Sequence, residues 1–188
     1  MTTELSPRTF CTFPRELSSP AGACAYRLVF VLVLLARDRR RIRHVAVTAH
    51  PTAAWTAQQL REAFPWDEAP RYLIHDRDHA FDSVRGTAKA MALEDVLTAP
   101  RAPWQNAFVE RCIGSARREC VDHVIVFNEA ALKRLMTLYC SYYEQSRTHL
   151  ALNKDAPIPR RIAVPSEGRV VAIPQVGGLH HWYERRAA

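Results

Sequence analysis

The chain has 188 residues, of which 48% are hydrophobic, and its 26 Lys and Arg outnumber its 19 Asp and Glu to give a net charge of +7. This length and apolar content favour one domain with extensions over two domains. Five Cys without a C-x-x-C pair exclude a zinc ribbon or a thioredoxin-like site, and their odd number argues against a disulfide framework. The basic charge is typical of a surface that binds phosphate groups.

The apolar segments are too short for a membrane protein. The longest run, Leu28 to Ala36, has nine residues, about half of what a membrane-spanning helix needs. The amino terminus lacks the pattern of a signal peptide, which is a basic segment, an apolar segment and a small-residue cleavage site. We therefore expect a cytoplasmic protein without a membrane partner, in which Cys112, Cys120 and Cys140 are small core residues in a reducing compartment.

The first half of the chain predicts strands that precede and follow one helix. Residues 1–25 contain three Pro and support at most one short strand, over Thr9 to Phe13. Two β-rich runs, 26–36 and 42–48, predict a hairpin with a basic tip. Five Arg between positions 37 and 43 could contact phosphates or belong to a solvated turn, and both readings stay open. Asp38 in this tip is interpreted as a turn residue.

A helix, a strand, a helix and a strand are predicted next. Thr52 can cap a helix that runs to Phe64, and a short buried strand over 72–74 delivers Asp76 to a sheet edge. An alanine-rich helix over 80–92 and a strand over 96–98 follow. Parallel strands separated by helices, beside an antiparallel hairpin, predict a mixed α/β sheet that is covered on both faces.

The second half predicts two amphipathic helices and a basic tail. Pro103 fits the start of a helix in which Glu110 lies at the border of a buried stripe. That stripe consists of Val109, Ile113, Ala116 and Cys120. Asn128 caps a second helix with a core-like apolar side. In the tail, residues 170–173 predict a strand, and the adjacent His180 and His181 are expected to be a surface pair.

Several motifs resemble the catalytic core of bacterial insertion-sequence transposases and retroviral-type integrases that carry a DDE triad. The segment Leu-Ile-His-Asp-Arg-Asp resembles the part of those proteins that holds the second Asp, and Trp-Gln-Asn-Ala-Phe-Val-Glu-Arg resembles the helix that holds the Glu. The two acids, Asp76 and Glu110, are 110 − 76 = 34 positions apart, close to the spacing typical of the family. The resemblance continues to Asp155-Ala156-Pro157 and covers roughly residues 26 to 160.

The resemblance implies a ribonuclease H-like fold and a catalytic site for DNA integration or transposition. Under it, Asp76 and Glu110 are the catalytic residues and the ligands of Mg2+ or Mn2+, because phosphodiester transfer of this kind uses two divalent ions about 4 Å apart and such ions prefer oxygen ligands. The alternative is a strand-end Asp that caps a turn and a helix Glu that is solvated. Candidate DNA contacts are Arg77, Trp104, Gln105, Asn106, Arg117 and Arg118. Asp78 is a possible assisting acid, although a structural or solvated role is favoured.

The first acid of the triad has no counterpart in this chain. In the alignment implied by the resemblance, Thr9 stands at its position, and the nearest acid, Glu16, lies in turn-like sequence between two Pro. A hydroxyl is a poor substitute for a charged Mg2+ ligand. We therefore expect an incomplete two-metal site and impaired strand transfer.

These patterns divide the chain into a degraded or poorly ordered segment (1–25), an integrase-like core (26–157) and a basic tail (158–188). The expected partner is DNA, as transposon ends and target, and self-association of the chain stays open. A catalytically silent nucleic-acid-binding remnant, another ribonuclease H-like nuclease and a generic basic structural domain remain as alternatives. The absent first Asp favours the remnant over either enzyme.

Overall fold

A computed structural model describes residues 8–17, 27–65, 69–75, 81 and 84–187 of the chain. Strands β1 to β5 form a five-stranded sheet with the order β3-β2-β1-β4-β5. Its strands are β1 (Arg8–Leu17), β2 (Arg27–Ala36), β3 (Ile42–Thr48), β4 (Tyr72–His75) and β5 (Glu94–Leu97). The pairs β1/β2 and β2/β3 are antiparallel, whereas β1/β4 and β4/β5 are parallel. The predicted mixed sheet is therefore confirmed.

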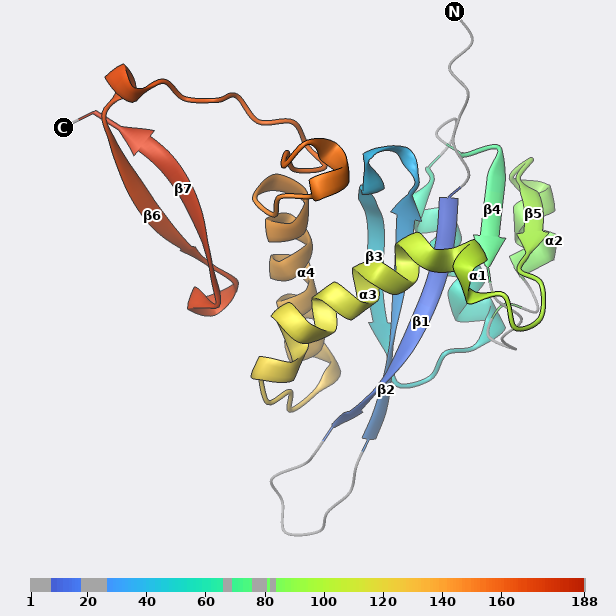
Figure 1. Cartoon of the computed structure of the whole chain (residues 1–188). Helices are drawn as coiled ribbons and strands as arrows, with labels where there is room; N and C mark the ends of the chain where they lie inside the picture. The colour runs from blue at the N-terminus through green and yellow to red at the C-terminus, as the bar shows by residue number, and fades with distance from the viewer. Residues whose placement is uncertain (1–7, 18–26, 66–68, 76–80, 82–83, 188) are drawn as a thin grey trace, which may run out of the picture.

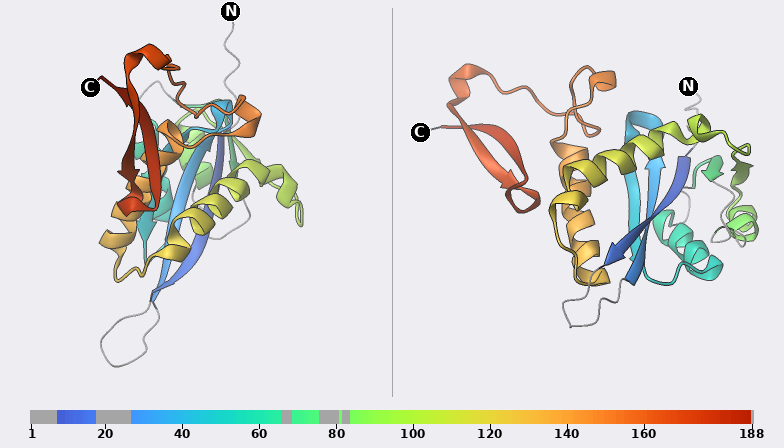
Figure 2. Two further views of the ribbon diagram at one scale, coloured as in Figure 1. Left: turned by 60° about the vertical axis from the view of Figure 1, so that its left-hand side comes forward. Right: turned by 60° about the horizontal axis from the view of Figure 1, so that its bottom comes forward.

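Helices cover both faces of this sheet (Figures 1 and 2). They are α1 (Ala53–Ala63), α2 (Val84–Ala90), α3 (Ala107–Glu119) and α4 (Glu129–Gln145). Strand β2 packs against the helices on both faces of the sheet because successive side chains of a strand point to opposite faces. Its residues 29, 31, 33 and 35 pack with α3 and α4, while Leu32 and Leu34 pack with α1 and α2. A strand that is buried on both faces explains the nearly continuous apolar run in the sequence.

The caps predicted from the sequence are confirmed. The Thr52 side chain accepts a hydrogen bond from the backbone N–H of Trp55 at the start of α1, at 3.2 Å. The Asn128 side chain does the same for Ala131 at the start of α4, at 2.8 Å. Each bond satisfies one of the backbone donors that a helix leaves without an intrahelical acceptor.

Strand β1 is longer than the predicted five residues. It pairs with β2 along its whole length, from Arg8 opposite Ala36 to Leu17 opposite Arg27. On its other side it pairs with β4 only at Arg8 and Thr9. Pro14 therefore lies where β1 has no described neighbour on that side, a position in which a strand tolerates a residue that lacks an N–H donor. The sheet thus includes residues that precede position 26.

Two other predicted elements have different bounds. Helix α2 ends at Ala90, two residues before the predicted end at position 92, because the chain turns at Met91 and Ala92, and Ala92 has a φ of 55°. Strand β5 begins at Glu94, two residues before the predicted start at position 96. Its register with β4 explains the shift, since Glu94 pairs with Tyr72 and Leu97 with His75.

The hairpin β2–β3 has the predicted basic tip, but the tip is attached to the rest of the protein. A short 3-10 helix, η1 (Asp38–Arg40), connects the strands. Arg39 donates hydrogen bonds of 2.9 Å to a carboxylate oxygen of Asp155 and to the backbone carbonyls of Ala156 and Pro157. One of the five Arg therefore fixes the segment that follows α4.

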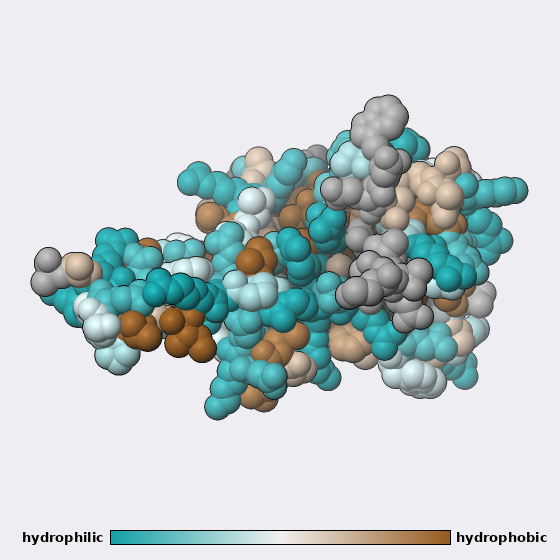
Figure 3. Space-filling view, turned by 90° about the horizontal axis from the view of Figure 1, so that it is seen from above, coloured by the Kyte–Doolittle hydropathy of each residue, from teal (hydrophilic) through white to brown (hydrophobic). Residues whose placement is uncertain are grey.

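The C-terminal residues form a second, two-stranded sheet that projects beyond α4 (Figure 1). It consists of β6 (Arg169–Gln175) and β7 (His180–Arg186), so the predicted strand is longer and gains a partner that was not predicted. The connecting residue Val176 is buried in the core next to α4. Hydrophilic side chains cover most of the surface seen from above, with hydrophobic ones in small groups (Figure 3). Val170, Leu179 and Tyr183 are the large exposed hydrophobic residues of this hairpin region.

The described part of the chain contains no helix that is long and apolar enough to span a membrane.

Candidate functional site

One of the two predicted acidic residues, Glu110, lies in the described part of the chain, close to the strand end that precedes the other. Strand β4 ends at His75, and the next residue, Asp76, lies outside the described residues. Glu110 lies in the first turn of α3. The carboxyl end of β4 lies beside the beginning of α3 (Figure 1). The backbone thus positions Glu110 next to the strand end that leads to Asp76.

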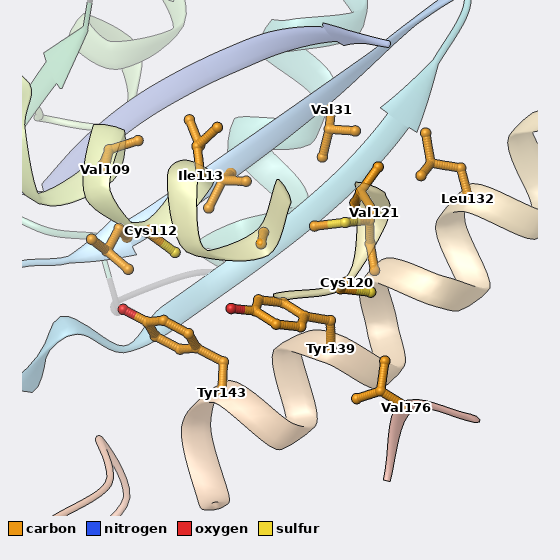
Figure 4. Close-up of a cluster of buried hydrophobic side chains, with 14 of the residues drawn as sticks. Val31, Val109, Cys112, Ile113, Cys120, Val121, Leu132, Tyr139, Tyr143 and Val176 are labelled. Atoms are coloured by element: carbon orange, nitrogen blue, oxygen red, sulfur yellow. The ribbon is translucent and has the colours of Figure 1, made fainter. Parts of the chain in front are cut away.

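Helix α3 presents Glu110 at the surface because its opposite side is buried. Val109, Ile113, Ala116 and Cys120 are each at most 6% exposed, which confirms the predicted apolar stripe. Figure 4 shows this side of α3 packed between the sheet and α4. Since Glu110 follows Val109 by one residue, about 100° around the helix, its side chain is exposed.

Thr9 lies in β1 beside the same strand end. In the parallel register of β1 and β4, Thr9 pairs with Ile74, two positions before Asp76. Strand β1 therefore passes the carboxyl end of β4 at Thr9. This is the residue that the predicted alignment sets in the place of the first acid of the triad.

His75 anchors the end of β4 in the sheet. Its side chain is buried and its Nε2 lies 2.6 Å from a carboxylate oxygen of Asp95 on β5. Arg85 of α2 donates to the other oxygen of Asp95 at 3.1 Å. Contacts among β4, α2 and β5 thereby hold His75, the residue that precedes Asp76. The pairing of His75 with Asp95 was not predicted from the sequence.

The predicted residues Asp76 and Glu110 would each offer carboxylate oxygens as ligands to a cation. In the described ranges, no group of three or more His, Cys, Asp and Glu side chains could hold a metal ion. Asp78 is outside those ranges, as is Arg77. Oxygen ligands of this kind match hard cations such as Mg2+, which binds one or two carboxylates and completes its shell with water and phosphate oxygens.

The remaining predicted DNA contacts differ in their accessibility. Trp104 is 71% exposed in the 3-10 turn η4 (Pro103–Asn106), and Gln105 is exposed, with its side-chain oxygen accepting from the backbone N–H of Ala99 at 2.7 Å. Arg117 and Arg118 are exposed in the last turn of α3. Asn106 is only 2% exposed at the start of α3, so its side chain is buried and not accessible at the surface.

A polar network at the other end of α3 was not predicted as a unit. Arg147, which follows α4, donates to both oxygens of the Glu119 carboxylate, with Nε–Oε2 at 2.7 Å and Nη2–Oε1 at 2.6 Å. The Tyr139 hydroxyl donates to Glu119 Oε2 at 2.9 Å, and Arg147 also reaches the Ser115 hydroxyl at 3.3 Å. In Figure 4, Tyr139 and Tyr143 extend from α4 towards α3 with their hydroxyl ends leading.

Burial and this ion pair shift the pKa values of the network. Burial would raise the pKa of Glu119, but the hydrogen bond and charge of Arg147 hold it below its ordinary value. The carboxylate in turn raises the pKa of Arg147 and, together with burial, that of Tyr139. Glu119 is therefore ionised and Tyr139 protonated near neutral pH, which is the state that the hydrogen bonds require.

His180 is not the surface residue that the sequence suggested. Its ring stacks on Tyr142 of α4 with centroids 4.2 Å apart, and its Nε2 lies 2.8 Å from the backbone carbonyl oxygen of Glu119. The prediction is wrong for His180 because the C-terminal hairpin packs against α4, whereas His181 is exposed.

Burial favours the protonated thiol form of three cysteines in the described part of the chain. Cys112 and Cys120 are buried, and desolvation raises the pKa of their thiols to about 12 and about 11. Cys140 is partly buried, and burial raises its pKa as well. Since the thiolate is the reactive form, all three behave as small core side chains.

Comparisons with known proteins agree with this architecture. Residues 92–157 match the integrase core domain family. The comparison with curated proteins found no match. Among solved structures, the catalytic core domain of BIV integrase aligns with a TM-score of 0.53 at 14% identity, over 81% of this chain and 91% of that one.

Two further solved structures show the same fold. The HTLV-2 integrase catalytic core domain, in complex with magnesium and in a trimeric form, aligns with a TM-score of 0.54 at 12% identity, over 81% of this chain and 95% of that one. A chain of a simian T-cell lymphotropic virus intasome, in complex with PP2A regulatory subunit B56 gamma, aligns with a TM-score of 0.60 at 12% identity, over 98% of this chain and 69% of that one. The predicted resemblance and fold are confirmed: the chain has the ribonuclease H-like fold of integrase catalytic cores, and residues 92–157 match the integrase core domain family.

Proposed function

We propose that the protein acts on DNA as the core of an integrase or transposase, with Asp76 and Glu110 as the acidic residues of its site. The observation that carries this proposal is that the carboxyl end of β4 lies beside the first turn of α3. That arrangement occurs in a fold shared with integrase catalytic cores and next to the segment that matches the integrase core domain family.

The proposed site would bind Mg2+ or Mn2+ through the carboxylates of Asp76 and Glu110. A bound divalent ion would supply charge stabilisation for the oxygens that exchange at the phosphodiester. The magnesium complex of the HTLV-2 integrase core supports this choice of cation. The protein itself contributes the rigid placement of β4, which the hydrogen bond between His75 and Asp95 braces.

Strand transfer by this chain is proposed to be weak. A second ion needs the acid that the resembling family supplies from its first strand, and Thr9 stands beside the β4 end instead. Loss of one ion removes several kcal/mol of transition-state stabilisation, and each 1.36 kcal/mol corresponds to about a tenfold change in rate. A defect of several orders of magnitude is expected. This observation also favours a second candidate function, a DNA-binding protein without catalysis.

The proposed core extends over residues 26–157 together with β1, which pairs with β2 throughout and therefore folds with it. Residues 158–188 are proposed to be a basic extension. Its hairpin, β6–β7, contacts α4 through Val176 and His180. The trimeric form of the HTLV-2 core supports self-association as a further proposal, which sedimentation of the purified chain would test.

An oligonucleotide cleavage and joining assay tests the enzymatic proposal. The unaltered chain, Thr9→Asp, Glu110→Gln and Asp76→Asn would be compared with Mg2+ and with Mn2+. We expect activity near background for the unaltered chain and partial gain for Thr9→Asp, which Glu110→Gln should abolish when the two changes are combined. Robust joining by the unaltered chain that survives Glu110→Gln would remove Glu110 from the site.

A metal-binding measurement tests the proposed ligands independently of strand-transfer activity. Mn2+ broadens NMR signals of nearby residues, so the backbone amides around Ile74, His75 and Glu110 should broaden in the unaltered chain. The effect should weaken in Glu110→Gln and in Asp76→Asn. Equal broadening in both variants would contradict the proposed ligands even if all proteins lack strand transfer.

A further inference from the structure

A cavity of about 290 Å3 lies between α3 and the segment that follows α4. We call it the arginine pocket because the side chains of Arg40, Arg111 and Arg147 line it, together with Phe108, Ser115 and His149. Four separate parts of the chain contribute to it: the hairpin tip η1, helix α3, the end of α4 and residues 147–151. Among the described residues that line it there is no Asp or Glu.

The arginine pocket has an excess of positive charge. Glu119 neutralises Arg147 through its two hydrogen bonds. Within the described part of the chain, neither Arg40 nor Arg111 forms an ion pair. The Arg40 guanidinium lies 5.2 Å from the ring centre of Phe108, which holds this charge at the wall of the pocket. Two guanidinium groups therefore remain available to an anion.

His149 adds one buried ring nitrogen, Nε2, that has no hydrogen-bond partner among the described residues. The residue as a whole is 5% exposed. Its Nδ1 lies 3.3 Å from Arg147 Nη1, a group that can only donate. Nδ1 therefore accepts that bond, and the neutral ring carries its hydrogen on Nε2. The result is a buried donor in a residue that lines a pocket already rich in donors.

Burial and the neighbouring charges keep the His149 ring neutral. Burial, followed by the charges of Arg147 and Arg40, lowers the pKa of His149 to about 4, against smaller opposing effects of the Tyr143 backbone and Glu119. A negative ligand would reverse the effect of the two Arg. Its binding should therefore raise the pKa of His149, which makes this ring an internal reporter of occupancy.

We propose that the arginine pocket binds a phosphate group of a polynucleotide. Guanidinium groups match the geometry of phosphate oxygens, and the His149 Nε2–H supplies a further donor. The volume is just below the roughly 300–1,000 Å3 of small-molecule sites, so it suits a single phosphate with part of its sugar. The source of the phosphate, a DNA strand, rests on the proposed function, whereas the chemistry of the pocket does not.

The arginine pocket lies on a different side of α3 from the proposed cation site. Phe108, Arg111 and Ser115 follow one another at spacings of three and four residues and share one side of the helix. Glu110 is one residue before Arg111 and thus about 100° around the helix. A phosphate held here would fix the strand at a second point, apart from the acidic residues.

NMR titration of the whole chain with inorganic phosphate tests the pocket without DNA. We expect the His149 ring signals to shift and its pKa to rise on binding. Arg111→Ala should weaken binding at least tenfold, and Arg40→Ala should do the same. Arg134→Ala is the matched control, because it removes one exposed charge from α4, away from the pocket. It should bind phosphate as the unaltered chain does.

Equal affinity of Arg111→Ala, Arg40→Ala and Arg134→Ala would overturn the proposal, as would phosphate binding that leaves the His149 pKa unchanged. A second titration uses a short oligonucleotide with and without a 5′-phosphate. If only the 5′-phosphorylated oligonucleotide shifts the His149 ring signals, the ligand is a terminal phosphate. If both oligonucleotides shift these signals, the ligand is an internal phosphate. Phosphate binding without DNA binding would leave the pocket intact and contradict the proposed function. DNA binding that does not move His149 and is insensitive to Arg111→Ala would contradict the pocket alone.

Discussion

Arg147 and Glu119 form a two-point ion pair that joins the end of α3 to the segment after α4, with donor–acceptor distances of 2.7 and 2.6 Å. The two residues are 28 positions apart in the sequence. Their side chains are only 22% and 27% exposed, so the pair is partly shielded from water. Because the Tyr139 hydroxyl binds the same carboxylate, three parts of the fold meet at one acidic group.

Glu119→Gln should destabilise the protein by about 1–3 kcal/mol. Removal of one partner leaves the other charge partly buried without compensation, which costs more than the net value of the pair. Urea unfolding would measure the change. Glu167→Gln is a matched control, since Glu167 pairs with Arg161 at 2.6 Å, but Arg161 is 78% exposed. This exposed pair should be worth less than about 1 kcal/mol, and a Glu119→Gln effect of the same size would contradict the structural role assigned to Glu119.

Stability should fall as the pH falls from about 6.5 towards 4. His149 has its pKa lowered from 6.5 to about 4 in the folded protein, so the unfolded chain takes up a proton in this range and the folded protein does not. The contribution is therefore complete above pH 6.5 and is lost progressively below it, by roughly 3 kcal/mol at pH 4, since one pKa unit corresponds to 1.36 kcal/mol. Glu119, whose pKa is lowered, adds a further loss below its ordinary value of 4.5.

Urea midpoints at pH 7, 6 and 5 would measure this dependence. The curve of His149→Gln should be flatter between pH 7 and 5 than that of the unaltered chain. Parallel curves for the two proteins would show that His149 is not the responsible group.

DNA binding should weaken steeply with salt and depend little on DNA sequence. Arg and Lys side chains that neutralise Z phosphates release counterions, so the logarithm of the affinity falls with the logarithm of salt concentration with a slope of about −0.9Z for duplex DNA. Arg111→Ala should reduce this slope by about one unit if its guanidinium contacts a phosphate. Fluorescence anisotropy between low and high salt measures the slope, and an affinity that stays constant would remove nucleic acid from the partners.

Gly168→Ala should disrupt the C-terminal hairpin. Gly168 has a φ of +114°, and a Cβ at this position would clash with the backbone oxygen of Arg186. Backbone atoms cannot move aside as a flexible side chain can, so the β6–β7 pairing should open. Hydrogen exchange of the amides in β6 and β7 should accelerate, while that of the five-stranded sheet should not change.

Gly86→Ala is the contrasting variant. A Cβ at Gly86 would have no heavy atom within 4 Å, and the residue lies inside α2. Alanine is favoured over glycine in a helix by about 1 kcal/mol, so this change should be neutral or stabilising. If the amides of β6 and β7 exchange as slowly in Gly168→Ala as in Gly86→Ala, the proposed clash of a Cβ at position 168 is contradicted.

Much of the local structure and the exposure of Glu110 could be predicted from the sequence. The 3.6-residue period of Val109, Ile113, Ala116 and Cys120 determines which side of α3 is buried, and therefore that Glu110 is exposed. The caps at Thr52 and Asn128 are likewise local, since each involves a backbone N–H three residues away. Such signals depend on neighbours in the chain and can be read without knowledge of the fold.

Other features were decided by tertiary structure because their partners are distant in the chain. β1 is ten residues long, despite its Pro, since it pairs with an apolar strand along its full length. His180 was mistaken for a surface residue because its neighbour Tyr142 lies 38 positions earlier. The arginine pocket combines Arg40, Arg111 and Arg147, each of which looks like an ordinary basic residue in the sequence. By itself, the sequence determined which residues are buried or charged and where helices begin. Only folding decided which of those charges meet, because a side chain selects its partner by distance in space.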